Sequence, residues 1–91
     1  MSYKILEHEK AIKFKRKHKN DKQLILRIDK KYIEIIRNPH SSALLELKSE
    51  KCPKCRRARV GNYRIVYFIS EKQNVIEIID IIPRRNDYRL F

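Results

Sequence analysis

Arginines gather at two places in this chain, and their positions suggest phosphate chemistry. One group stands around the chain's single glycine, Gly61, and the other surrounds Tyr88 near the C-terminus. A guanidinium keeps its charge at any working pH and matches the oxygens of a phosphate. An aromatic ring among arginines is typical of proteins that stack RNA bases. The groups therefore predict a surface for a polyanion; they are Arg56, Arg57, Arg59 and Arg64, and Arg84, Arg85 and Arg89.

A predicted β-hairpin orders the first group. Gly61 and Asn62 suit the positive φ angles of a tight turn and separate an expected strand, 56–60, from another, 63–69. A two-residue turn pairs residues across the hairpin on a common side of the sheet. One side is then apolar and fit to pack under helices; it carries Ala58, Val60, Tyr63 and Ile65.

The other side of the hairpin carries Arg57, Arg59 and Arg64, with Arg59 directly opposite Arg64. Like charges that face each other destabilise a sheet, so an anionic ligand is expected there. The alternative is that the long arginine side chains simply extend into solvent.

The pair Cys52 and Cys55 supplies only half the ligands of a structural zinc site. No second cysteine pair exists, and a metal would need His40 together with a ligand from another subunit. We therefore predict two thiols at the start of a strand and no bound metal.

The helices and strands that must position these residues are predicted from the periodicity of apolar residues and from the residues that end each element. Residues 3–7 suit a short edge strand, and 9–17 suit a lysine-rich helix. A second helix, capped by Asn20, is stopped at Pro39 and buries Leu24, Ile28, Tyr32 and Ile35. We leave 40–51 as a connector, and a last strand follows at 75–82. The predicted fold is a two-layer α+β domain over residues 1–91, in which an N-terminal strand and a helical hairpin pack on a small antiparallel sheet.

The charge balance agrees with a polyanionic partner. Lys and Arg number 23 against 11 Asp and Glu, a net charge of +12. The sequence contains neither an apolar run of about 20 residues that would span a membrane nor the apolar core of a signal peptide. With only two cysteines, a reducing cytoplasm is the expected location.

These residues resemble the RelE/ParE superfamily of toxins from type II toxin-antitoxin modules. The resemblance rests on the run from Arg59 to Tyr67, an apolar strand after it, and the run from Pro83 to Tyr88. It extends over nearly the whole chain. RelE-like members enter the ribosomal A site and cut mRNA through attack of the RNA 2′-hydroxyl on the adjacent phosphate, and a cognate antitoxin silences them. The resemblance thus implies an endoribonuclease without a cofactor, with mRNA, the ribosome and a RelB-like antitoxin as partners.

By position, the resemblance assigns the catalytic roles to Arg64, Arg84, Tyr88 and Arg57. Arg64 and Arg84 would bind the phosphate, and Tyr88 would stack on a base or orient the 2′-hydroxyl. Flanking cations would hold the RNA; they are Lys51, Lys54, Arg56, Arg59, Arg85 and Arg89.

The sequence departs from the family where the first hairpin strand should offer lysines. Arg57 occupies one such position and Cys55 the other. Because arginine is a poor proton acceptor, the general base stays open between Lys51, Lys54 and no dedicated base. Two other functions also stay open: a ParE-like inhibitor of DNA gyrase, and a relative that binds RNA or DNA without cutting it.

Overall fold

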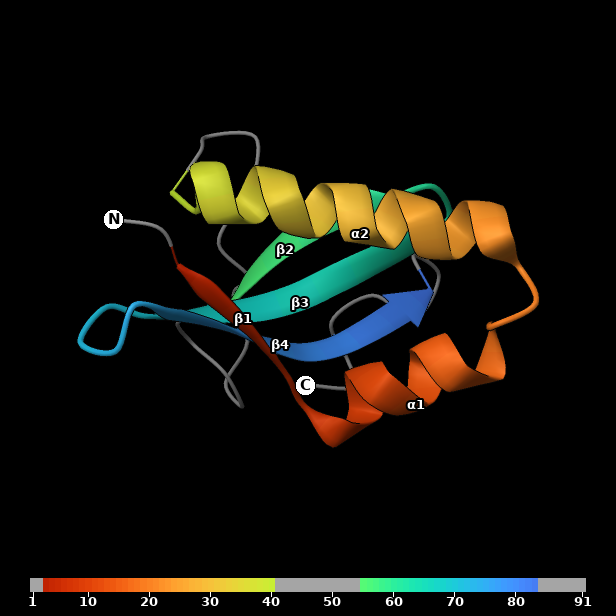
Figure 1. Cartoon of the computed structure of the whole chain (residues 1–91), viewed down its shortest axis with the longest axis horizontal. Helices are drawn as coiled ribbons and strands as arrows, with labels where there is room; N and C mark the ends of the chain where they lie inside the picture. The colour runs from red at the N-terminus through yellow and green to blue at the C-terminus, as the bar shows by residue number, and fades with distance from the viewer. Residues whose placement is uncertain (1–2, 41–54, 84–91) are drawn as a thin grey trace.

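The structure is a computed structural model, and it describes residues 3–40 and 55–83. Two helices, α1 and α2, follow a short first strand, and three further strands complete a four-stranded sheet with the order β1-β4-β3-β2 (Figure 1). The predicted α+β fold is confirmed. The elements are β1 (Lys4–Glu7), α1 (Glu9–Lys17), α2 (Lys22–Arg37), β2 (Arg56–Val60), β3 (Tyr63–Ser70) and β4 (Val75–Pro83).

The sheet is mixed rather than wholly antiparallel. The strands β2, β3 and β4 pair antiparallel as expected, whereas β1 joins the edge parallel to β4, with Ile5 beside Ile76. Parallel neighbours need a long crossover connection. The helices and the β2–β3 hairpin lie between β1 and β4 in the chain and supply it.

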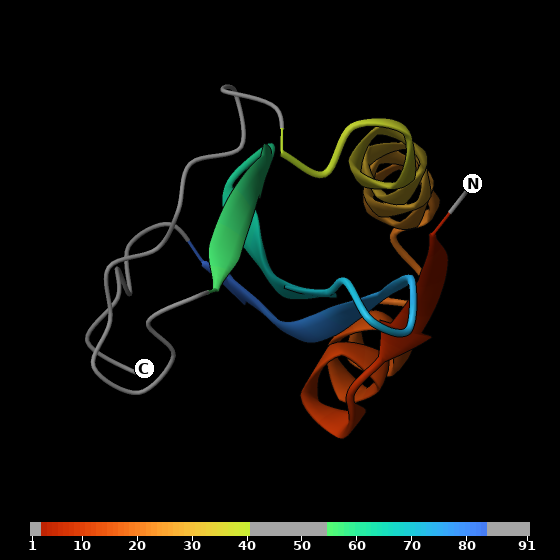
Figure 2. The ribbon, with the colours of Figure 1, turned by 90° about the vertical axis from the view of Figure 1, so that its left-hand side faces the viewer.

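Strand β1 pairs only with the first half of β4, and helix α1 begins where β1 ends. The N–H of His8 donates to the carbonyl of Ile78 at 2.8 Å, and α1 begins at the next residue, Glu9. From there α1 packs along the second half of β4, as Figures 1 and 2 show from two sides. Helix α1 thereby covers a strand edge that would otherwise expose unpaired backbone groups.

The N-cap of helix α2 lies one residue later in the chain than predicted. The carboxylate of Asp21 accepts a hydrogen bond from the N–H of Leu24 at 3.2 Å, so Asp21 and not Asn20 is the N-cap. A carboxylate serves well there because the helix dipole favours negative charge at its N-terminus. The predicted apolar stripe is confirmed, since its members are all buried: Leu24, Ile28, Tyr32 and Ile35.

The β2–β3 hairpin has the predicted two-residue turn and the predicted register, but within the turn a positive φ occurs only at Gly61 and not at Asn62. Gly61 adopts a φ of +55°, whereas among the described residues only Asn74 is a non-glycine with positive φ. A positive φ at the first central position alone fits a type II′ turn. Across the hairpin, Val60 faces Tyr63 and Arg59 faces Arg64.

The sheet has an apolar cluster on each side. The helix-facing side holds the main core, where α1 and α2 pack on residues from every strand. The other side carries a smaller cluster that the sequence analysis did not predict; it consists of Cys55, Val66 and Ile82, with Phe68 and Ile79 packed against it. This outer face is therefore partly apolar and not only a row of arginines.

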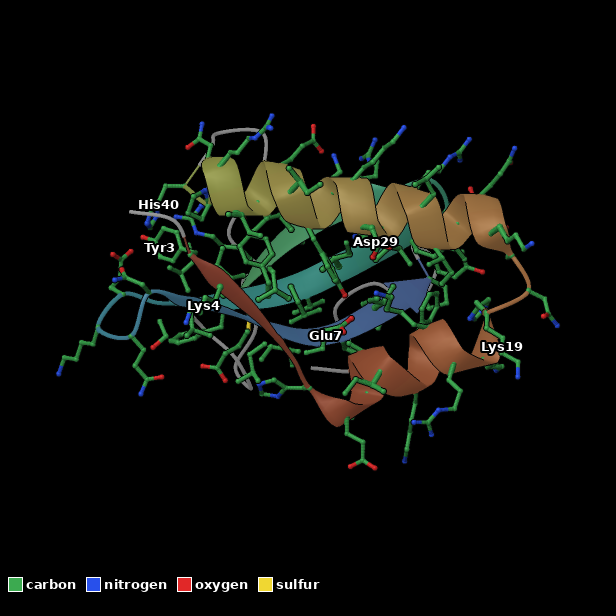
Figure 3. The ribbon with its side chains drawn as sticks, in the orientation of Figure 1. Tyr3, Lys4, Glu7, Lys19, Asp29 and His40 are labelled. Atoms are coloured by element: carbon green, nitrogen blue, oxygen red, sulfur yellow. The ribbon has the colours of Figure 1, made fainter. Side chains whose placement is uncertain are left out.

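A polar network at the edge of the main core joins three elements. Lys15 of α1 places its Nζ 3.4 Å from Glu7 of β1 and 3.0 Å from Asp29 of α2. The hydroxyl of Tyr32 donates to the same Glu7 carboxylate at 2.9 Å. Burial and this hydrogen bond raise the pKa of Tyr32, which keeps the phenol protonated. Figure 3 labels Glu7 and Asp29 on either side of this junction.

Replacing Gly61 with alanine is expected to lower the free energy of unfolding by about 1 kcal/mol, because a Cβ disfavours positive φ. A Cβ at this position would lie 3.5 Å from Nη1 of Arg27, an ordinary contact, so steric clash adds little. Urea denaturation measures the difference. Asn62→Ala is the matched control because Asn62 has no positive φ. An equal loss in both variants would contradict this account of the turn.

Candidate nucleic-acid interface

Three arginines share the outer face of the sheet, away from the helices. Arg59 of β2 lies directly opposite Arg64 of β3, and Arg57 lies one row further along, opposite Val66. Directly opposed residues have Cβ atoms roughly 5 Å apart, so the two opposed guanidinium groups can reach one ligand. We call Arg57, Arg59 and Arg64 the arginine face.

The three side chains differ in how firmly they are held. Arg59 is exposed, whereas Arg57 and Arg64 are half-buried, and each of these two makes a further interaction. Their row neighbours Val66 and Ile82 belong to the outer apolar cluster. Cations set beside apolar side chains lose part of their hydration, and this strengthens their attraction for an anion.

Arg56 is not part of this face. It pairs with Tyr67, whose side chain belongs to the helix-facing core, because successive side chains of a strand alternate between its two sides. Burial raises the pKa of Tyr67 to about 12, and the charge of Arg56 opposes that rise. The hydroxyl of Tyr67 donates to the carbonyl of Pro39 at 3.0 Å. Arg56 therefore lies apart from the three arginines with which the sequence analysis had grouped it.

The other predicted site residues lie outside the described residues, and their assignments stay predictions. They are the catalytic candidates Arg84 and Tyr88 and the RNA-binding candidates Lys51, Lys54, Arg85 and Arg89.

Cys55 stands at the entry to β2, fully buried and disulfide-bonded. The prediction of free thiols is therefore wrong for Cys55. A disulfide sulfur is neither a thiolate ligand nor a proton acceptor. Residues 3–40 and 55–83 contain no group of three or more histidine, cysteine or acidic side chains placed to hold a metal ion.

The histidines are engaged away from the arginine face. His8 contacts Glu77 at 2.8 Å, and His40 contacts Glu71 at 2.7 Å. His18 is half-buried: its Nδ1 donates to the carbonyl of Phe14 at 2.9 Å, and its ring stacks on the Phe14 ring. Each imidazole has a structural partner.

Asp80 is a polar residue of this face that the sequence analysis missed. Ile79 is an extra residue of β4 at a β-bulge, and Asp80 then pairs with Val66 in the same row as Arg57. Its Oδ1 accepts a hydrogen bond from the N–H of Ile81 at 2.8 Å. Burial raises the pKa of Asp80, against that hydrogen bond and the charge of Lys10. The only sequence signal was an acid inside an apolar strand.

Comparison with known proteins identifies the family. Residues 4–88 match the model of the ParE toxin of the type II toxin-antitoxin system parDE. The chain belongs to this toxin family. A search of curated protein sequences gives no significant match.

Solved structures of RelE toxins share the fold. The toxin of the Mycobacterium tuberculosis RelBE2 complex is 20% identical, with a TM-score of 0.75 over 92% of this chain and 100% of that one. A mutant of the E. coli toxin RelE in the free state is 25% identical, with a TM-score of 0.73 over 94% and 87%. A chain of the intact E. coli RelBE complex is 26% identical, with a TM-score of 0.61 over 88% of this chain and 99% of that one. The predicted RelE/ParE superfamily is confirmed.

In the described part of the toxin, no helix is long and apolar enough to cross a membrane.

Asp80→Asn is expected to stabilise the toxin at pH 7. A carboxyl whose pKa is raised by folding favours the folded state only while it is protonated, so the wild type loses that contribution as pH rises through the raised pKa. The gain of the asparagine variant should therefore disappear near pH 3, below the ordinary carboxyl pKa of about 3.9.

Guanidinium denaturation of both proteins between about pH 3 and 7 measures this difference. Glu9→Gln is the control, because Glu9 is an exposed acid in a surface ion pair with Lys13. A stability gain for Asp80→Asn that is independent of pH would show that burial of the charge is not its cause.

Proposed function

We propose that this toxin is a ribosome-dependent endoribonuclease that cleaves mRNA in the A site. The observation that carries the proposal is the arginine face, in which Arg59 and Arg64 stand directly opposite each other with Arg57 beside them. A sheet holds like charges together at a cost, and a phosphate between them offsets that cost. The likeness to RelE toxins that are 25% to 26% identical supports the same function.

The reaction places clear demands on the site. The RNA 2′-oxygen forms a bond to phosphorus while the bond from phosphorus to the 5′-oxygen breaks, which leaves a 2′,3′-cyclic phosphate and a 5′-hydroxyl. The 2′-hydroxyl gives its proton to a base, and the departing 5′-oxygen receives one. Negative charge builds on the phosphate oxygens in between. Arg64 and Arg57 stabilise that charge, together with Arg84, while Tyr88 orients or stacks the substrate.

Two residues of the first hairpin strand and its approach are unsuited to accept the proton of the 2′-hydroxyl. Arginine stays protonated, so Arg57 serves charge stabilisation and not proton removal. The disulfide removes a thiolate at Cys55 from consideration. The remaining alternatives are Lys51 or Lys54, either of which would need a lowered pKa, and a 2′-hydroxyl that reacts without a dedicated base.

A cognate antitoxin is the proposed protein partner, as in the E. coli RelBE complex and in the RelE–RelB complex of Pyrococcus horikoshii, a 27% identical toxin. The net charge of +12 favours an acidic partner, since otherwise so basic a chain would bind nucleic acids without selection.

A second function is inhibition of DNA gyrase by a ParE-like toxin that cuts no nucleic acid. The specific observation in its favour is the family model itself, which describes the ParE toxin of parDE. Fold cannot separate the two functions. Primer extension on a translated message reads out cleavage, and a gyrase supercoiling assay with the same protein reads out the alternative. Supercoiling inhibited with the message intact would replace the proposal.

Replacing Arg64 with alanine is expected to slow single-turnover cleavage of ribosome-bound mRNA by ~10² to 10³, since a preorganised contact to the developing charge is lost. Arg16→Ala on α1 is the matched control, an exposed arginine that lies on a helix rather than on the sheet. Thermal melting of each variant verifies folding. Unchanged cleavage by a folded Arg64→Ala protein would remove the arginine face from the reaction.

The pH dependence of cleavage should contain no ionisation that belongs to a histidine. The groups assigned to the reaction are arginine, lysine and tyrosine, whose ordinary pKa values are about 10 or above, whereas a histidine pair gives a bell near neutrality. The pH dependence of the single-turnover rate measures this. An ionisation near 6.5 that disappears in His40→Ala would assign the chemistry to another part of the chain.

A further inference from the structure

Helix α2 carries apolar side chains on its solvent side as well as on its buried side. Leu26 is 55% exposed and Ile33 is 50% exposed, and they stand two helical turns apart. Each is two positions from a buried residue, Ile28 or Ile35, and two positions turn a helix by about 200°. Leu26 and Ile33 therefore project away from the sheet.

Cations continue the same line along the helix. Lys22, Lys30 and Arg37 fall at helical spacing with Leu26 and Ile33, so the five residues form one stripe, which we call the outer stripe of α2. Figure 3 shows nitrogen-tipped side chains pointing away from the sheet along this helix.

The charge of the outer stripe is not balanced within the described residues. The acids of α2 are engaged elsewhere: Asp29 pairs with Lys15 of α1, and Glu34 pairs with Lys31. Among the ion pairs between described residues, none includes Lys22, Lys30 or Arg37. The stripe thus offers two apolar side chains among three cations that form no ion pair with any described residue.

We infer that the outer stripe of α2 is the docking site of an amphipathic helix that presents an apolar seam flanked by carboxylates. Two apolar residues seven apart match the knobs of a second helix laid along α2. The three cations call for carboxylates beside that seam. RNA is a less suitable ligand for the stripe, because its charged phosphates would bind the cations but would offer no apolar surface to Leu26 and Ile33. The inference rests on the proposed function for the source of this helix, which is the antitoxin.

This site lies on the far side of the molecule from the arginine face. The buried side of α2 packs on the inner face of the sheet, while Arg57, Arg59 and Arg64 lie on its outer face. Figure 2 shows α2 to one side of the sheet. A helix on the outer stripe therefore leaves the arginines open, so anchoring of the antitoxin and blocking of the substrate are separate functions of different segments.

The test uses a labelled helical peptide of about 20 residues with a leucine seam flanked by glutamates, and fluorescence anisotropy with the full-length toxin. Leu26→Glu/Ile33→Glu is expected to weaken binding by about 10-fold or more. The matched control is Leu6→Glu/Ile12→Glu, which alters residues of similar exposure, 53% and 40%, on β1 and α1. Equal losses in the two double variants, both with wild-type melting, would overturn the inference.

Charge is tested separately with Lys30→Glu and with Lys72→Glu as control, since Lys72 lies in the β3–β4 turn. Weaker binding of the acidic peptide only to Lys30→Glu supports the inference, and tight binding of a glutamine version of the peptide contradicts it. Binding of anionic phospholipid vesicles that depends on Leu26 and Ile33, without binding of the peptide, would assign the stripe to a membrane surface.

The last arm uses a 2′-O-methyl RNA oligonucleotide, which cannot be cleaved. Saturating peptide should leave its affinity for the toxin within about twofold, because the two sites lie on opposite sides of the sheet. Displacement of the RNA by the peptide would overturn the separation of sites. Since no cleavage is measured in any arm, a failure of the nuclease proposal would appear in the message assay and not here.

Discussion

The register of the β2–β3 hairpin is the constraint on which the rest of the structure depends. A two-residue turn with Gly61 at positive φ aligns Arg59 with Arg64 and sends every second side chain to the same side. In that register Ala58 and Ile65 lie buried under the helices while the arginines face outward. A slip of one residue would reverse the faces and force guanidinium groups into the core, at a cost of several kcal/mol for each buried charge.

The helical layer keeps this arrangement in place and leaves the outer face accessible. Helix α2 buries its stripe on the inner face of the sheet, and α1 covers the edge of β4 beyond β1. Lys15 joins β1, α1 and α2 through Glu7 and Asp29. Since α2 lies on the inner face and α1 lies along the edge of β4, the described elements leave the outer face of the sheet and the solvent side of α2 free for different tasks. The outer face suits phosphate, and the solvent side of α2 suits a protein helix.

Local patterns in the sequence predicted most of the elements and the hairpin pairing, because helical spacing, the proline at 39 and the Gly61-Asn62 turn act over a few residues. The partner of β1 was not predictable in the same way. Its parallel pairing with β4 joins residues about seventy positions apart, and nothing in four residues of strand specifies that choice.

The same limit applies to the candidate site. Strand alternation correctly set Arg57, Arg59 and Arg64 on one face, and it also sets Arg56 on the other, which a grouping by composition overlooked. Three features depend on how separate strands pair and pack, and local patterns did not predict them. They are the bulge at Ile79, the pairing of Asp80 with Val66 and the outer apolar cluster. The cap at Asp21 was missed by one residue because Asn20 and Asp21 are both good capping residues.

The central claim is that the arginine face binds the phosphate that is cut. The most direct measurement is the position of that phosphate in an electron cryomicroscopy structure of the toxin on a ribosome, with a message carrying a 2′-O-methyl group at the cut site. The account predicts phosphate oxygens within about 3 Å of the guanidinium nitrogens of Arg64, with Arg57 or Arg59 beside them. A message that runs along the helices, with Arg57, Arg59 and Arg64 in solvent, would contradict it.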